Sequence, residues 1–176
     1  MLDATTFANL IKTNLSGITD AASANTILGN TISSYLLANT VFTFTWTAAM
    51  TVTPFTPDPV TVTTGTFTSL TITITPSGAT TTANAMDALE SQIISGMTSA
   101  TYNITTTGFT TTPASMGSSS TLNNLDLTPS GETDGTLALQ NMCQKIINWV
   151  KQLAPIATVP GTHGVYTGTG VVSSIA

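Results

Sequence analysis

Apolar residues recur at helical spacing in four segments of the chain. In residues 3–18 the apolar side chains follow one another at intervals of three, four and seven positions, and Asp3 stands where a helix N-cap is expected. The same period appears in residues 23–38, 82–97 and 136–153. Ser23 and Asp134 are the expected caps of the second and fourth of these segments. The pattern therefore predicts four amphipathic helices.

Elsewhere the period falls from nearly four to two. Residues 41–47, 60–63 and 70–75 alternate threonine with valine, isoleucine, leucine or an aromatic residue, which is typical of strands buried on one face. Residues 101–105 predict another short strand. Three prolines in residues 54–59 exclude a regular element there, so this break is either an ordered turn or an exposed arm. We expect a long hairpin or meander whose threonine face meets water or another subunit.

Two further segments complete the organisation of the chain. Residues 108–135 are rich in Ser, Thr, Gly and Asn and form the longest irregular connection, which at such a length is usually functional or disordered. After Pro155, residues 156–176 contain four glycines and end in β-branched residues. We expect an α+β fold: a single domain over residues 1–155, with about four helices and an antiparallel Thr-rich sheet or long hairpin, and an extended Gly-rich C-terminal arm over residues 156–176.

Composition narrows the classes of function. Threonine occupies 40 of the 176 positions, arginine is absent, and charged residues make up 6% of the chain, against about 25% in ordinary soluble domains. The net charge of −5 argues against nucleic acid as a partner, because affinity for a phosphate backbone comes largely from Lys and Arg. The uncharged stretch of residues 21–57 is interrupted by Thr, Ser and Asn, so no membrane span is expected. The first residues lack the pattern of a secretion signal.

Candidate catalytic and metal-binding groups are few. His163 is the only histidine, and it is flanked by glycines. Cys143 is the only cysteine and lies in a helical pattern, where a small buried apolar residue is the expected role. Asp87 and Glu90 share one helix face, where we expect solvation rather than an acid/base pair or a divalent-ion site. No enzymatic activity, cofactor, metal or small-molecule substrate is predicted.

The two tryptophans allow a binding function to be considered. Aromatic rings stack on sugars and bases, so Trp46 and Trp149 are candidates for a carbohydrate-binding module. Both lie on periodic apolar faces, however, and a place in the core is the favoured interpretation.

Both ends of the chain resemble small virion structural proteins of tailed bacteriophages. The resemblance consists of the start Met-Leu-Asp-Ala-Thr-Thr at residues 1–6, the amphipathic Phe-Ala-Asn-Leu-Ile-Lys at residues 7–12, a charge-poor Thr/Gly/Ala-rich body, and Gly-Thr-Gly-Val-Val at residues 168–172. It implies a subunit of a symmetric assembly in the tail, neck or baseplate, located in the virion after assembly in the host cytoplasm. Its partners would be copies of itself and other virion proteins.

This interpretation predicts contacts through the C-terminal arm, by addition of a strand to the sheet edge of a neighbour. The candidate contact residues are Val165, Tyr166, Val171, Val172 and Ile175. A capsid decoration protein or an extracellular filament subunit is the alternative, and a carbohydrate-binding or hydrolytic module is the third class considered.

Overall fold

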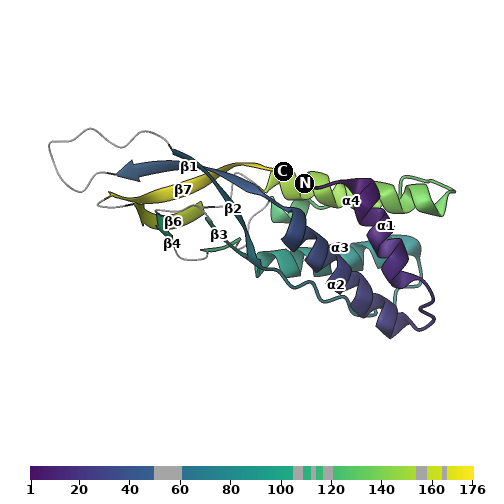
Figure 1. Cartoon of the computed structure of the whole chain (residues 1–176). Coiled ribbons are helices and arrows are strands. Elements are labelled where there is room, and N and C mark those ends of the chain that lie inside the picture. The colour runs from purple at the N-terminus through teal and green to yellow at the C-terminus, as the bar shows by residue number, and fades with distance from the viewer. Residues whose placement is uncertain (50–60, 105–108, 112–113, 117–120, 154–157, 164–165) are drawn as a thin grey trace.

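The structure is a computed structural model that describes residues 1–49, 61–104, 109–111, 114–116, 121–153, 158–163 and 166–176. The predicted α+β class is confirmed: the described residues form four α-helices and an antiparallel sheet. Figure 1 shows the four helices gathered at one end of the molecule and the sheet extending from them toward the other end.

The four helices lie close to their predicted positions. They are α1 (Ala4–Leu15), α2 (Ala21–Asn39), α3 (Thr82–Thr98) and α4 (Gly135–Gln152). Asp3 and Asp134 are N-caps, as predicted. The predicted cap Ser23 is wrong, because the Asp20 carboxylate accepts the backbone N–H of Ser23 at 2.7 Å and the helix begins at Ala21. Thr81 caps α3.

Seven strands form one sheet in the described part of the chain. They are β1 (Phe42–Ala49), β2 (Thr61–Ser69), β3 (Thr101–Ile104), β4 (Phe109–Thr111), β5 (Ala114–Ser115), β6 (Thr158–His163) and β7 (Tyr166–Ile175). Their order is β4-β6-β7-β1-β2-β3-β5, and every pair is antiparallel. The predicted irregular connection, residues 108–135, thus includes two short strands and a 3-10 helix at Leu122–Asn124.

The segment predicted as a C-terminal arm contains β6 and β7. Strand β7 lies between β6 and β1, and Phe42 of β1 is paired with Ile175 of β7. Beyond that pair, Val41 and Ala176 exchange both backbone hydrogen bonds, at 3.0 and 2.9 Å. The last residues of this segment therefore pair with the start of β1. Docking of the segment on a neighbouring subunit stays a prediction.

Residues 70–75, predicted as a strand, instead form an extended connection that we call the strap. Leu70 and Ile72 are buried while Thr71 and Thr73 are exposed, so the alternation is that of a strand. The strap is not a strand of the sheet, because it lies against helices. The Ile72 N–H donates to Ser33 Oγ of α2 at 2.8 Å.

Glycines on both neighbouring helices allow the strap to approach closely. A Cβ placed on Gly29 of α2 would lie 2.5 Å from the carbonyl oxygen of Ile72. A Cβ on Gly96 of α3 would lie 2.7 Å from both the Thr71 oxygen and the Ile72 side chain. The strap is therefore packed between α2 and α3 with no room for a methyl group at either contact.

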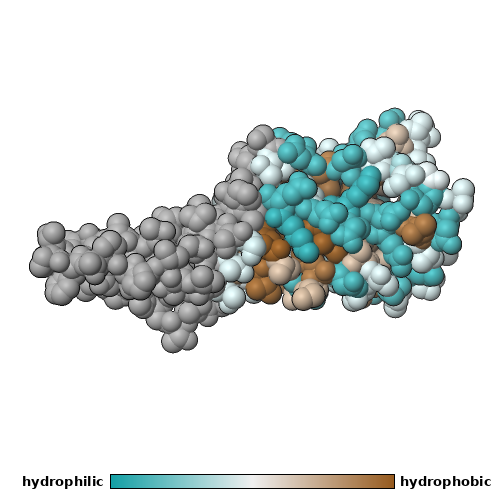
Figure 2. Space-filling view, turned by 90° about the horizontal axis from the view of Figure 1, so that it is seen from above, coloured by the Kyte–Doolittle hydropathy of each residue, from teal (hydrophilic) through white to brown (hydrophobic). Residues whose placement is uncertain are grey.

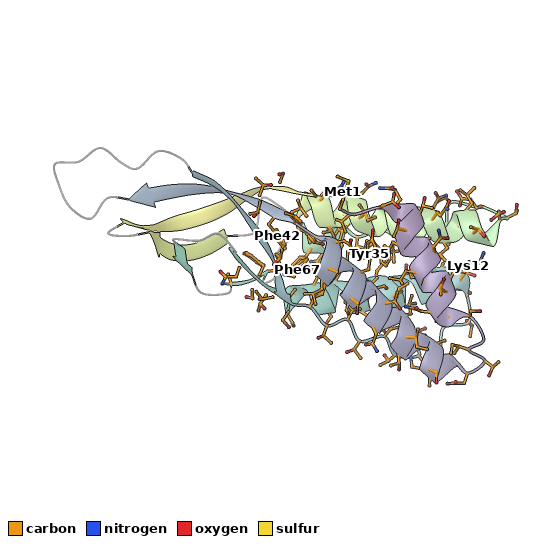
Figure 3. The ribbon with its side chains drawn as sticks, viewed as in Figure 1. Met1, Lys12, Tyr35, Phe42 and Phe67 are labelled. Carbon is orange, nitrogen blue, oxygen red and sulfur yellow. The ribbon has the colours of Figure 1, made fainter. Side chains whose placement is uncertain are left out.

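One hydrophobic core joins the helices to the base of the sheet. Phe7 of α1 and Tyr35 of α2 stack with ring centroids 4.1 Å apart, while Phe42 packs edge-on against Phe67 at 4.9 Å. Figure 3 shows Tyr35 among the helices and the other labelled pair, Phe42 and Phe67, where the helices meet the sheet. The described part of the predicted irregular connection adds buried side chains to this core: Met116, Leu122, Leu125 and Leu127.

Candidate functional site

The base of the sheet has one apolar and one hydroxyl-rich face. Phe42, Phe67, Tyr102 and Ile175 point into the core, and their sequence neighbours point the other way. We define the hydroxyl face as Thr43, Thr64, Thr66, Thr68, Ser69, Thr101, Asn103 and Ser174. All of these side chains are partly or fully exposed, and none carries a charge.

The register aligns the hydroxyl face into rows across the strands. Thr43 is paired with both Thr64 and Ser174, so one row crosses β7, β1 and β2. On the next strand pair, the hydroxyl groups of Thr68 and Thr101 lie 2.8 Å apart and share a hydrogen bond. Cross-strand pairs of this kind stabilise a sheet. A hydroxyl group can both donate and accept, so a group that already shares one hydrogen bond keeps the capacity for another.

The predicted contact residues fall in three situations. Val165 lies outside the described residues. Tyr166, Val171 and Val172 belong to β7, where the backbone of Val171 is paired with Thr45 and that of Val172 with Phe44. Ile175, predicted to contact a neighbour, is instead 6% exposed and packs in the core of its own chain, because its position opposite Phe42 turns it toward the helices.

The two acids of α3 have different roles. Asp87 is exposed, as predicted for a solvated face. Glu90 is half-buried, and its carboxylate accepts the backbone N–H of Leu127. This bond attaches the segment after the 3-10 helix to α3. Within the ranges that the structure describes, no three His, Cys, Asp or Glu side chains gather where they could hold a metal ion.

Cys143 and Trp149 of α4 are core residues, as predicted. Cys143 is fully buried, and burial raises the pKa of its thiol to about 12. Trp149 is 2% exposed, and its indole N–H donates to the carbonyl oxygen of Leu122 at 3.1 Å. The Trp149 ring is therefore not available to stack on a sugar. Trp46 lies in β1, and His163 ends β6. Of α4, Leu137 departs from the predicted inward stripe and is 46% exposed.

A cavity of about 350 Å³ lies between α3, α4 and residues 127–132, which precede α4. Its wall is mainly apolar, with Met86, Leu139 and Met142 among the lining residues. At its polar side the Lys145 ammonium donates to the Thr128 carbonyl oxygen. The one charged donor is thus already engaged in holding the loop.

A second hollow, of about 300 Å³, runs along the outer side of the α1/α2 pair. It is lined by Leu10, Asn14, Ile27, Asn30, Thr31 and Ser34. Leu37, further along α2, is 37% exposed. The apolar period of residues 23–38 predicts Ile27 on the inward side of the helix, but Ile27 is half-buried and lines this outer hollow. The outer surface was not among the predicted contacts. Its signal in the sequence is the absence of any charge from Ala21 to Asn39.

Figure 2 gives the distribution of polarity over another side of the helical body. Hydrophilic side chains cover much of this side, and hydrophobic ones gather where the body approaches the sheet. No helix in the described parts of the chain combines the length and apolar character needed to cross a bilayer. No protein-family model, curated protein or solved structure matches this chain.

Proposed function

We propose that this protein is a structural subunit of a phage particle, from the tail, neck or baseplate, and that it acts through protein–protein assembly. The observation that carries the proposal is the hydroxyl face of the sheet, a surface of aligned Thr, Ser and Asn side chains without a charge. The phage assignment adds to this the resemblance of both chain ends to small virion structural proteins.

The physical argument concerns the cost of covering such a surface. An ion that loses its water without gaining a partner costs far more free energy than a hydroxyl group that exchanges water for another hydrogen bond. A surface made of threonine can therefore be buried by a neighbour without a matching set of counter-charges. A chain with 6% charged residues suits repeated contacts between subunits better than it suits recognition of an ionic substrate.

The sheet edges add a second kind of contact. The terminal strands β4 and β5 have three and two residues, and short edge strands are a common protection against uncontrolled pairing. Ordered addition of a neighbour's strand then requires a defined partner, as in β-augmentation. Tyr166, Val171 and Val172 belong to β7, which lies between β6 and β1 and is not an edge strand, so we expect them to contribute through the faces of the sheet and not through strand addition.

The position of the gene tests the class of particle. A gene among those for the sheath, tube and baseplate supports the proposal, whereas one beside the major capsid gene favours a decoration protein. A gene among those for surface filaments favours the filament subunit. Either of the last two results overturns the tail, neck or baseplate assignment.

A pair of variants tests the role of the hydroxyl face. Thr68→Asp places a charge on the exposed face of β2, and Thr80→Asp places the same charge on an exposed position outside the sheet. Both proteins should keep the helical circular dichroism of the wild type. Only Thr68→Asp should fail to enter particles in a complementation assay. Normal incorporation of Thr68→Asp would remove the hydroxyl face from the proposal.

A further inference from the structure

The outer side of α2 forms a continuous uncharged stripe. Ile27, Asn30, Ser34 and Leu37 follow one another at intervals of three and four, so they lie on one face of the helix. Asn30, Ser34 and Leu37 are exposed, and Ile27 is half-buried. We call these four residues the α2 stripe. It lines the hollow beside α1 over most of its length.

The helix itself is unusual for a surface position. None of the 19 residues of α2 is charged, whereas a helix that covers a core normally carries charged side chains on its outer side. An outer side without charges can be covered by another element without the cost of desolvating an ion. In the described residues of one chain, nothing but α1 flanks this hollow.

The order of residues in the stripe is self-complementary. Ile27 and Leu37 stand at equal distances on either side of Ile32, and so do Asn30 and Ser34. When two copies of α2 meet antiparallel about a two-fold axis at this midpoint, Ile27 of one copy lies opposite Leu37 of the other. Asn30 then lies opposite Ser34, and an amide and a hydroxyl group can exchange a hydrogen bond. A two-fold contact requires this kind of matching of one patch with itself.

Charge also favours a second copy at this surface. The chain has a net charge of −5, so the repulsion between two copies is smallest where the surfaces that meet carry no charge. Acids are exposed elsewhere, for example at Asp87 on α3 and at Asp134 at the start of α4. Lys12 of α1 faces the other way, since it lines a separate hollow next to Asp134. The α2 stripe brings two copies together without burying or opposing a charge.

We propose that the protein self-associates as a two-fold dimer through antiparallel α2 helices, with Ile27 of each copy against Leu37 of the other. This inference deepens the proposed assembly function and rests on it for its biological role, while the contact itself can be measured on the isolated protein. A 19-residue helix is about 28 Å long and about 10 Å wide, so α2 offers on the order of 300 Å² before α1 adds its flank. A standard interface has about 800 Å² per partner. The dimer is therefore reversible in dilute solution and strengthened by other contacts in the particle.

Sedimentation velocity of the purified full chain tests the proposal, at concentrations from about 5 to about 500 μM, where a contact smaller than the standard interface dissociates. The wild type should shift from monomer to dimer over this range. Leu37→Glu should raise the dissociation constant at least about tenfold, because it places a charge against the apolar Ile27 of the other copy. Leu137→Glu is the matched control, because Leu137 is also an exposed leucine on a helix but lies on α4. It should dimerise like the wild type.

A charge swap tests the register. Ile27→Lys alone should weaken the dimer, and Ile27→Lys combined with Leu37→Glu should restore it, because the two new charges meet across the two-fold axis. Circular dichroism of each variant checks that the monomer is folded. If Leu37→Glu reduces folding, disulfide trapping of Asn30→Cys/Ser34→Cys serves in its place, and the buried Cys143 does not compete for the oxidant.

Each outcome decides the proposal. A wild type that stays monomeric, a Leu37→Glu variant that dimerises normally, or a double variant that is not restored overturns the antiparallel α2 contact. Larger oligomers that survive Leu37→Glu and are lost with Thr68→Asp would indicate self-association through the sheet instead. Because these measurements use the isolated chain, failure of the dimer leaves the gene-position and incorporation tests of the proposed function unaffected.

Discussion

Replacement of Gly29 by alanine tests how closely the strap is packed. In an ordinary exposed helix interior this change would stabilise the fold by about 1 kcal/mol, since alanine is the better helix former. Here the added methyl carbon would lie 2.5 Å from the Ile72 carbonyl oxygen and 3.3 Å from the Ile74 nitrogen. Both are backbone atoms, so no side-chain rotation relieves the contact.

The expected loss follows from two contributions. Forcing an extra methyl group into a packed site costs roughly 1–3 kcal/mol. Moving the strap away from α2 also weakens the bond from the Ile72 N–H to Ser33 Oγ, which contributes on the order of 1 kcal/mol. After the helix-propensity gain is subtracted, we expect Gly29→Ala to lower the free energy of unfolding by about 1–3 kcal/mol. For a chain of this size that corresponds to a decrease of Tm by roughly 2–12 °C.

Thermal and urea unfolding followed by circular dichroism measure this effect. Gly135→Ala is the matched control, because Gly135 begins α4 and a Cβ there meets nothing within 4 Å. That variant should be neutral or slightly more stable. Gly96→Ala should behave like Gly29→Ala, since it meets the strap from the α3 side. An unchanged or raised Tm for Gly29→Ala, equal to that of Gly135→Ala, would refute the close packing of the strap between the two helices.

Three further predictions concern the core and the ionisable groups. Phe42→Ala should lower the free energy of unfolding by about 3–5 kcal/mol, measured by urea unfolding, because Phe42 is fully buried against the rings of Phe67 and Tyr102; a loss below about 1 kcal/mol would contradict its place in the core. Cys143 should resist alkylation at pH 8 until denaturant is added, because burial raises the pKa of its thiol from 9.0 to about 12. The stability that the protonated thiol contributes is complete below pH 9 and is lost as pH rises toward 12. Rapid labelling of the native protein would show that the thiol is accessible. Hydrogen bonds from residues of the first helical turn lower the pKa of three N-cap carboxylates below 3.8: Asp3, Asp20 and Asp134. The stability that these carboxylates contribute is present above pH 3.8 and is lost as pH falls through their pKa values in the folded protein. Tm should therefore fall on acidification below about pH 4, and it should fall less steeply when the three residues are replaced by asparagine.

The helices were predictable because each carries its own signal. The apolar period of α1 and α4 and the carboxylates of Asp3 and Asp134 are local, and the structure uses both. The sequence predicts Ser23 as the cap of α2, because serine is a common N-cap. Asp20 takes that role three residues earlier. An error of this size is common, since several adjacent residue types can cap the same helix.

The strap shows where local patterns stop being sufficient. Its alternation correctly predicts which side chains are buried, but alternation alone does not distinguish a strand from an extended segment on helices. The difference lies in the partners of the backbone, and Ser33 and Gly29 stand far from Ile72 in the sequence. The burial of Ile175 is likewise not evident from local sequence, because it depends on pairing with Phe42, which lies far away in the chain.

The two candidate contact surfaces differ in how much of each could be predicted from the sequence. Only part of the hydroxyl face was predictable from the alternation of threonine, because Thr43 and Thr101 lie in predicted strands while residues 64–69 of β2 lie between the predicted strands 60–63 and 70–75. The structure adds these residues and the register that aligns Thr43 with Thr64 and Ser174. The α2 stripe was not predicted. The apolar period of residues 23–38 predicts an inward side, but without charges the sequence does not show which other positions of α2 stay exposed. These become evident only from the positions of α1 and the strap.

The pairing of β1 with β7 has a consequence for the order in which the chain folds. Helices α1 and α2 are complete early in synthesis, and β1 follows them directly. Its neighbour on one side is β7, the last described strand. That side of β1 therefore has unpaired backbone groups until β7 has left the ribosome. Contacts between such distant segments form slowly, and an exposed strand edge is a site for aggregation meanwhile. Expression at low temperature, or together with chaperones that shield strands, should therefore raise the yield of soluble protein.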